Sequence, residues 1–189
     1  AQWLLQLINI HAGQLDAAGG SLPNDPAIPM TGPGTSAGGN ARWRSRVRGL
    51  AELSGELPAA AMAEEITTGG AGQVRALLTC AGNPVLSTPD GKRLGAALAT
   101  LDFMVSIDVY INETTRHAHL ILPPAWFLTQ PHFDLIFNAF AVRRYVRLSQ
   151  PARVQQENER ADWQICNALG AALAGATHRE WRELPPPRE

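Results

Sequence analysis

Residues 74–107 decide the fold, and they read VRALLTCAGNPVLSTPDGKRLGAALATLDFMVSI. Two apolar runs, residues 74–80 and 103–107, have the length and composition of buried strands. Thr88 is the expected N-cap of a helix between them, with Pro89 in its first turn. The apolar residues that recur at the spacing of one face of this helix are Leu94, Ala97, Leu98 and Leu101. A strand, a helix and a strand in this order predict a βαβ unit with two parallel strands.

The chain after this unit continues the alternation of helices and strands. A short helix is expected near residues 112–117, followed by a third strand at 120–122 that Pro123 and Pro124 end. Beyond it we expect a helix at 133–140, extended chain at 141–148, a last helix at 159–174 and a linker at 177–189. The fold class is therefore α/β, with a mostly parallel sheet that helices cover on both faces.

The first 70 residues lead into this domain. Residues 2–10 read as a helix that ends near Gly13 and buries most of its surface, so the chain is expected to be an internal piece of a longer protein. Ten of the 21 residues from 19 to 39 are Gly or Pro, which predicts a long loop. A short helix is expected at 58–66.

Arginine alternates with other side chains over residues 42–48. One interpretation is a solvated face, with Trp43 and Val47 turned inward. The other is that one or two of these arginines meet phosphate, which guanidinium groups bind in a bidentate manner.

Composition and cysteine use exclude several classes of function. The formal net charge is −1, so no strong attraction to nucleic acid or a membrane surface is expected. No apolar run approaches the roughly 20 residues that a membrane span needs. Cys80 and Cys166 are expected to be buried free thiols, with a disulfide between them as the alternative. No CxxC motif supports a zinc or iron–sulfur site, and His117 with His119 lacks a third ligand nearby.

Candidate binding residues follow the first two predicted strands. Ligands of open α/β sheets bind beyond the carboxyl ends of parallel strands, where Gly82, Asn83, Pro84 and Asp108 are expected. Gly82 would let a ligand approach the backbone, and Asn83 offers an amide that donates and accepts. The Asp108 carboxylate could accept hydrogen bonds from ribose or from a guanine edge. The alternative is structural, with a Gly-Asn-Pro turn and a simple aspartate cap.

Several blocks of sequence also carry a family resemblance. They are RALL at 75–78, GNPVLS at 82–87, LDFMVSID at 101–108, NETTRHA at 112–118 and LILP at 120–123. In this order and spacing they resemble the molybdopterin-dependent oxidoreductases, which include formate dehydrogenases, nitrate reductases and dimethyl sulfoxide reductases. The similarity extends, more loosely, from the first helix to residue 165.

This resemblance implies a Rossmann-like three-layer domain at residues 71–176 that binds part of a molybdopterin guanine dinucleotide carrying molybdenum or tungsten. Carried over by position, the cofactor contacts fall on Gly82, Asn83, Pro84 and Asp108, and on Thr114 and Thr115 as weaker candidates. We expect no catalytic or metal-ligating residue here, and the ligands of any iron–sulfur cluster would lie elsewhere in the parent enzyme.

The parent would transfer electrons between a small substrate and a redox chain. Its expected partners are its own remaining domains and a redox partner subunit. It is expected in the cytoplasm, or in the periplasm if a preceding segment carries an export signal.

Two other functions are consistent with parts of the sequence, and one residue departs from the family pattern. The chain could be a scaffold of an electron-transfer complex that has lost the cofactor, although Gly82, Asn83 and Asp108 argue against this. It could also be the central domain of a thiamine-diphosphate enzyme, against which the block at 112–123 argues. Relatives usually carry an acidic residue where this chain has His119.

Overall fold

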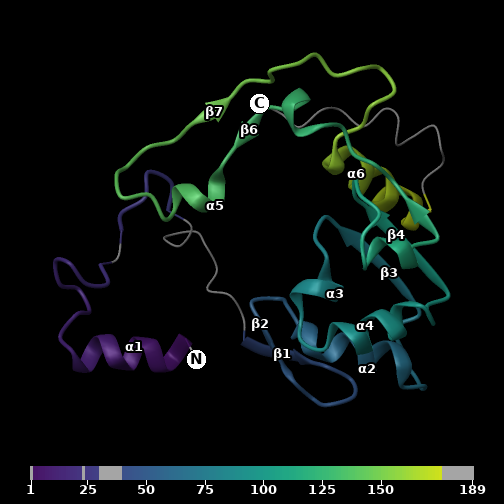
Figure 1. Ribbon diagram of the computed structural model, residues 1–189, viewed down its shortest axis with the longest axis horizontal. Helices are drawn as coiled ribbons and strands as arrows, with labels where there is room; N and C mark the ends of the chain where they lie inside the picture. Colours follow the sequence, from purple (N-terminus) through teal and green to yellow (C-terminus); the bar gives the residue numbers. More distant parts are fainter. Residues whose placement is uncertain (1, 23, 30–39, 176–189) are drawn as a thin grey trace. The chain divides into compact units, whose positions relative to one another are not determined.

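The structure is a computed structural model that describes residues 2–22, 24–29 and 40–175 (Figure 1). The chain divides into two compact units. One comprises Ala1–Ala37 and Pro131–Pro151, and the other comprises Gly38–Gln130 and Ala152–Glu189. The regions predicted with boundaries after residues 70 and 176 remain predictions, and the linker at 177–189 lies outside the described residues.

The second unit contains a parallel sheet of three strands, β3 (Ala76–Cys80), β4 (Phe103–Ile107) and β5 (Leu120–Ile121), in the order β3-β4-β5. Ala76 lies opposite Phe103, and the register continues without a break to Cys80 opposite Ile107. The predicted mixed α/β class with parallel strands is therefore confirmed. The Rossmann-like three-layer arrangement remains a prediction.

Helix α4 (Gly91–Leu98) connects β3 to β4, as the βαβ pattern predicted, but its start differs from the prediction. An additional short helix, α3 (Pro84–Ser87), comes first, and Thr88 donates its hydroxyl to the Pro84 carbonyl at 2.7 Å. The N-cap of α4 is instead Asp90, whose carboxylate accepts the Arg93 N–H at 3.3 Å. Thr88 was the wrong cap because its side chain is used to end α3.

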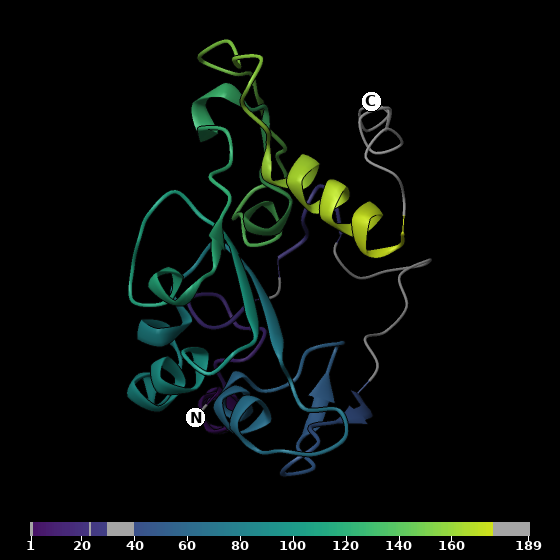
Figure 2. The same cartoon turned by 90° about the vertical axis from the view of Figure 1, so that its right-hand side faces the viewer.

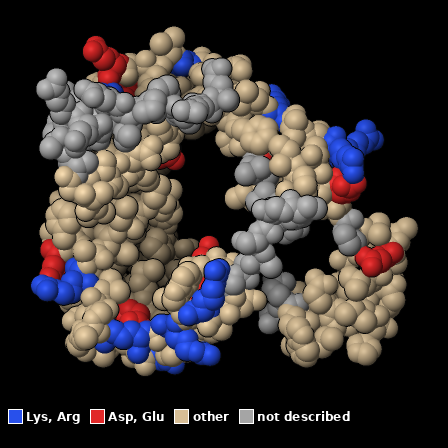
Figure 3. Space-filling model, turned by 180° about the vertical axis from the view of Figure 1, so that it is seen from behind, with Lys and Arg blue, Asp and Glu red and all other residues tan. Residues whose placement is uncertain are grey.

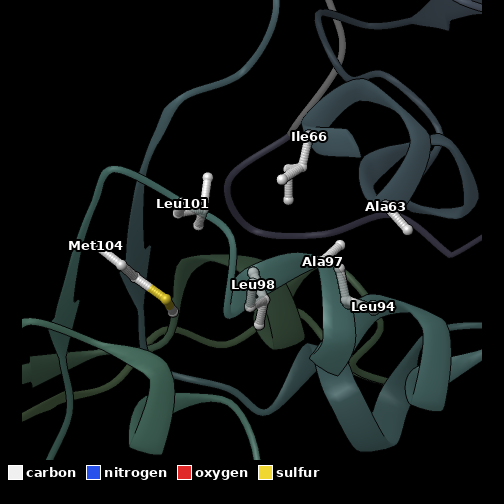
Figure 4. Packing of buried hydrophobic residues seen from close by; sticks show 7 residues of the cluster. All are labelled: Ala63, Ile66, Leu94, Ala97, Leu98, Leu101 and Met104. Carbon is white, nitrogen blue, oxygen red and sulfur yellow. The ribbon is translucent and has the colours of Figure 1, made fainter. Parts of the chain in front are cut away.

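The core of this unit lies where α4 packs against α2 (Met62–Thr67), which follows the short helix η1 (Ala59–Ala61), and against the sheet (Figures 2 and 4). The predicted helix at 58–66 is thus present. The buried cluster consists of Ala63, Ile66, Leu94, Ala97, Leu98, Leu101 and Met104. It includes all four apolar residues predicted to line one face of this helix, namely Leu94, Ala97 and Leu98 in α4 and Leu101 just after it. Truncation of a buried Leu or Met to Ala in such a cluster costs about 2–5 kcal/mol.

Residues 40–53 form an antiparallel hairpin, which the sequence analysis did not predict. Strand β1 (Asn40–Arg44) pairs with β2 (Ala51–Leu53). The prediction that Trp43 and Val47 turn inward was wrong, because Trp43 is 56% exposed and Val47 38% exposed. The strand pairing satisfies the backbone of β1 without burying its large side chains.

Two of the arginines that follow β1 are paired with carboxylates of α2. Arg46 forms an ion pair with Glu65 at 3.4 Å, and Arg48 forms one with Glu64, which is largely buried. Figure 3 shows blue and red side chains next to each other in the lower part of the molecule. These two arginines therefore have carboxylate partners within the chain, and Glu64 is shared with Arg93 at 3.8 Å.

Helix α6 (Asp162–Leu173) lies within the predicted range of the last helix. Two short turns of 3-10 helix, η2 (Thr115–His117) and η3 (Phe127–Thr129), precede it in this unit. Cys80 on β3 and Cys166 on α6 are both free and exposed. The expectation of buried thiols was wrong, because both side chains reach the surface of this chain.

The first unit contains α1 (Gln2–His11), α5 (Leu135–Asn138) and a pair of short antiparallel strands, β6 (His132–Phe133) and β7 (Leu148–Ser149). Helix α1 ends before Gly13, which has a φ of +66°, as predicted. Its apolar side chains are exposed, however, with Trp3 at 71% and Ile8 at 63%. Helix α5 covers only part of the helix predicted at 133–140, since Asp134 caps it by accepting the Phe137 N–H at 2.9 Å.

Extended chain at 141–148 is confirmed only at its end, where β7 begins. The described residues between 19 and 29 contain no helix, and residues 30–39 of the predicted loop lie outside the described part. Within the described ranges, no helix has the length and apolarity that crossing a membrane requires.

Candidate functional site

Two turns meet at the carboxyl edge of the sheet in the second unit. Strands β3 and β4 remain paired to their last residues, and the Ala81 N–H then donates to the Ile107 carbonyl at 2.9 Å. Gly82 follows Ala81, two residues beyond the end of β3, and Asp108 directly follows β4. The structure therefore places the two predicted loops at adjacent strand ends.

The turn after β3 has an unusual backbone conformation. Ala81 and Gly82 have φ angles of +55° and +79°, in the region that glycine adopts without a steric penalty. Apart from Gly82 itself and its two chain neighbours, no heavy atom of the described chain lies within 4 Å of the position that a Cβ would take at Gly82. The space above Gly82 is thus open, and a ligand could approach its backbone closely.

The turn after β4 depends on the Asp108 carboxylate. Its Oδ1 accepts the N–H groups of Val109 at 2.7 Å and Tyr110 at 3.1 Å. Its Oδ2 accepts only the long 3.4 Å hydrogen bond from Asn112 Nδ2 among the described residues. Since a carboxylate oxygen has two lone pairs, Oδ2 retains the capacity to accept hydrogen bonds from a ligand.

A third turn, formed by Asn112 to Thr115, is held together by hydrogen bonds among its own residues. Asn112 Oδ1 accepts the N–H groups of Thr114 and Thr115, each at 2.9 Å. The Thr115 hydroxyl donates to the Tyr110 carbonyl at 2.8 Å and accepts the Asn112 N–H at 2.8 Å. Thr115 is 1% exposed, so its side chain serves to hold this turn.

Side chains connect the third turn to the turn after β3. Asn83 Oδ1 accepts the Thr114 hydroxyl at 2.6 Å, and Asn83 Nδ2 donates to Glu113 Oε2 at 2.6 Å. The Thr114 hydroxyl also accepts the Val85 N–H at 3.0 Å, and Thr114 is fully buried. The hydrogen bond from Asn83 lowers the pKa of Glu113 below its ordinary value, with a smaller contribution from the Glu113 backbone N–H.

The six predicted site residues all lie at this edge of the sheet, but in two environments. Gly82 is exposed, and Asn83, Pro84 and Asp108 are partly exposed, whereas Thr114 and Thr115 are buried. Their contact with a ligand remains a prediction. From the sequence, Asn112 and Glu113 were interpreted only as part of a run, with Thr114, that caps a helix, although such a run also signals a side-chain-stabilised turn.

The two histidines after this turn differ in their contacts. His119 Nδ1 accepts the Met104 N–H at 3.0 Å, and its ring lies 5.6 Å from the Phe103 ring between centroids. His117 Nε2 is buried without a hydrogen-bond partner in the described chain, and burial, followed by the Arg116 charge, lowers the pKa of His117. No cluster of three potential metal ligands occurs among the described residues.

The sequence is similar to those of known oxidoreductases. A family model described as molybdopterin oxidoreductase matches residues 18–172. The chain is 32% identical over 102 residues to the assimilatory nitrate reductase catalytic subunit of Bacillus subtilis (strain 168), covering 54% of this chain and 14% of that protein. It is 33% identical over 123 residues to a nitrate reductase of Synechocystis sp. (strain ATCC 27184 / PCC 6803 / Kazusa), covering 59% of this chain and 16% of that protein.

A shorter match concerns a formate dehydrogenase. The chain is 44% identical over 43 residues to the F420-dependent formate dehydrogenase subunit alpha of Methanocaldococcus jannaschii, covering 23% of this chain and 6% of that protein. In each case the chain spans only a small part of the relative's length.

Proposed function

Because the chain belongs to the molybdopterin oxidoreductase family, we propose that it is the segment of such an enzyme that holds one end of a molybdopterin guanine dinucleotide. Family membership implies a molybdopterin cofactor. When bound, this cofactor supplies the metal centre through which electrons pass. The residues of this chain contribute binding and orientation, and we assign none of them a catalytic role.

The observation that carries the proposal is the adjacency of the Gly82 turn and the Asp108 turn at one edge of a parallel sheet. The groups at this edge suit the two kinds of contact that a dinucleotide makes, one through its sugars and phosphates and one through its base. The open backbone at Gly82 suits close approach of a sugar or phosphate, because no side chain intervenes. The available oxygen of Asp108 suits the N–H groups of guanine or the hydroxyls of ribose.

The hydrogen bonds also suggest a division of roles among the six residues. Gly82 and Asp108 have groups that can reach a ligand, and Pro84 begins α3 and limits the turn to one conformation. Thr114 and Thr115 use their hydroxyls within the chain. We therefore propose that these two threonines support the site, while Gly82, Asn83 and Asp108 form its surface.

For the parent enzyme we propose electron transfer between a small substrate and a redox chain, through molybdenum or tungsten. The similar proteins are named as nitrate reductases and a formate dehydrogenase, which are oxidoreductases of small anions. A redox partner subunit and a cytoplasmic location, with the periplasm as the alternative, are part of the same proposal. Metal analysis of the full-length parent separates it from a cofactor-free scaffold.

The decisive experiment replaces Asp108 in the full-length parent by Asn. An Asn Oδ1 can still accept the Val109 and Tyr110 N–H groups, so the turn is retained, but the second oxygen becomes an N–H donor. A hydrogen bond to a charged group contributes about 1.5–3 kcal/mol, or roughly ten- to hundredfold in affinity. We expect cofactor retention, measured as released pterin and bound metal after dilution, to fall by about that factor.

The matched control is Asp102→Asn, at the opposite end of β4. Asp102 pairs with Arg75, and both side chains are more than half exposed, at 54% and 73%. Such a pair contributes at most about 1 kcal/mol to stability. Equal cofactor content in the two variants would refute the assignment of the nucleotide to this edge.

A further inference from the structure

Glu113 has no role in the binding surface described above, yet its carboxylate contacts that surface. Glu113 Oε2 lies 2.6 Å from Asn83 Nδ2, across 30 residues of sequence. Glu113 is only partly exposed, and it follows Asn112 in the third turn, between β4 and β5. Its carboxylate therefore connects two turns that belong to different strands of the sheet.

This contact determines which way the Asn83 amide points. The Thr114 hydroxyl accepts the Val85 N–H, so its single hydrogen is available for Asn83 Oδ1, at 2.6 Å. If the amide were reversed, its oxygen would face the Glu113 carboxylate, where two acceptors would repel each other. Only the observed orientation satisfies Thr114 and Glu113 together.

The correct orientation in turn holds the backbone of α3 in place. The Asn83 carbonyl accepts the N–H groups of Leu86 and Ser87, each at 2.9 Å, and Val85 donates to Thr114. Asn83 is also the residue after Gly82, where the space that a Cβ would occupy is open. Displacement of the Asn83 side chain would therefore disturb the backbone that the ligand is proposed to approach.

From this geometry we propose that Glu113 is a positioning residue for the cofactor. It fixes the Asn83 amide, so that the turn containing Gly82 has its binding conformation before the cofactor arrives. The inference rests on the proposed function, and it adds a residue that acts through Asn83 and does not touch the cofactor. A preformed turn increases affinity because binding then requires no further ordering of the chain. A glutamate carboxyl is already ionised at neutral pH, and the hydrogen bond from Asn83 lowers the pKa of Glu113 further, in keeping with this role.

The test uses the full-length parent with Glu113→Ala, Glu113→Gln and, as the control, Glu159→Ala. Glu159 is also partly exposed and accepts one backbone N–H, that of Gln156 at 3.1 Å, but it has no hydrogen bond to the three turns among the described residues. Two quantities are measured. One is cofactor content after dilution, and the other is hydrogen exchange of the Val85 amide in the cofactor-free enzyme.

We expect Glu113→Ala to speed exchange of the Val85 amide by about tenfold and to weaken cofactor retention by a similar factor, as for loss of one hydrogen bond to a charged group. Glu113→Gln should restore most of the protection of the Val85 amide and most of the cofactor retention, because the glutamine amide oxygen can accept the same hydrogen from Asn83. Glu159→Ala should match the wild type. A purely structural role would speed exchange of the Val85 amide without lowering cofactor retention.

Three outcomes would overturn the proposal. These are Val85 exchange in Glu113→Ala equal to that in Glu159→Ala, cofactor loss without a change at Val85, and faster exchange without cofactor loss. Failure of the proposed function has a different signature. In that case the Asp108→Asn enzyme retains its cofactor, whatever result the Glu113 variants give.

Discussion

Two glycines of α4, one helical turn apart, provide a sharp test of how this site is packed. An ideal Cβ on Gly91 would overlap the Val85 carbonyl oxygen and lie 2.9 Å from the Val85 carbonyl carbon. An ideal Cβ on Gly95 would lie 3.7 Å from Val85 Cγ1 and 3.8 Å from His117 Nε2, which are ordinary contact distances. Alanine should therefore be tolerated at residue 95 and harmful at residue 91.

The expected free energies have opposite signs. Gly95→Ala should stabilise the chain by roughly 0.5–1 kcal/mol, since glycine within a helix is unfavourable by that amount relative to alanine. Gly91→Ala should destabilise it by about 1–3 kcal/mol, because the clash involves backbone that cannot rotate away. The two variants should thus differ by about 2.5 kcal/mol, or roughly 5–10 °C in Tm for a chain of this size.

The assay is urea unfolding of the 189-residue chain, followed by far-UV circular dichroism. It is accompanied by cofactor analysis of the parent enzyme carrying each variant. Because the Val85 N–H is bonded to Thr114, Gly91→Ala should also displace the Asn83 turn and lower cofactor content. Equal unfolding midpoints for the two variants would refute this account of how α4 packs against α3.

Two histidine predictions follow from the same structure. His119→Asp should change Tm by less than about 4 °C, because Asp Oδ1 and His Nδ1 are both bonded to Cγ and either can accept the Met104 N–H. His119→Leu has no such acceptor and should lower Tm by more. A larger fall in Tm for the Asp variant than for the Leu variant would contradict this prediction. Folding lowers the pKa of His117, mainly through burial, so the free energy of unfolding should fall as the pH drops below 6.5. In urea titrations at several pH values, His117→Leu should make the free energy of unfolding less dependent on pH. An unchanged pH dependence in this variant would count against the prediction.

Much of the fold could be predicted because the patterns that indicate it are local. The range of β4 agrees with the predicted residues 103–107, and β3 lies within the predicted 74–80. Apolar spacing also identified Leu94 and Leu98 as core residues of α4. These predictions succeeded because a buried strand or helix face requires apolar residues at a fixed period, whatever its neighbours are.

Predictions failed where the outcome depends on a partner distant in sequence or on competition between nearby groups. Strand β1 is rich in arginine and becomes a strand because β2 pairs with it, which its own composition does not indicate. Thr88 and Asp90 both suit an N-cap, and the presence of α3 decided between them.

The sequence by itself determined the α/β class, the order β3-α4-β4, and Gly82 and Asp108 as the residues that follow adjacent parallel strands. Only the tertiary structure showed that Thr114 is buried against Asn83, that Glu113 orients the Asn83 amide, and that His119 accepts a backbone N–H of β4. The physical reason is that periodicity specifies which face of an element is apolar. A hydrogen bond between side chains 30 residues apart exists only once packing has placed donor and acceptor within about 3 Å of each other.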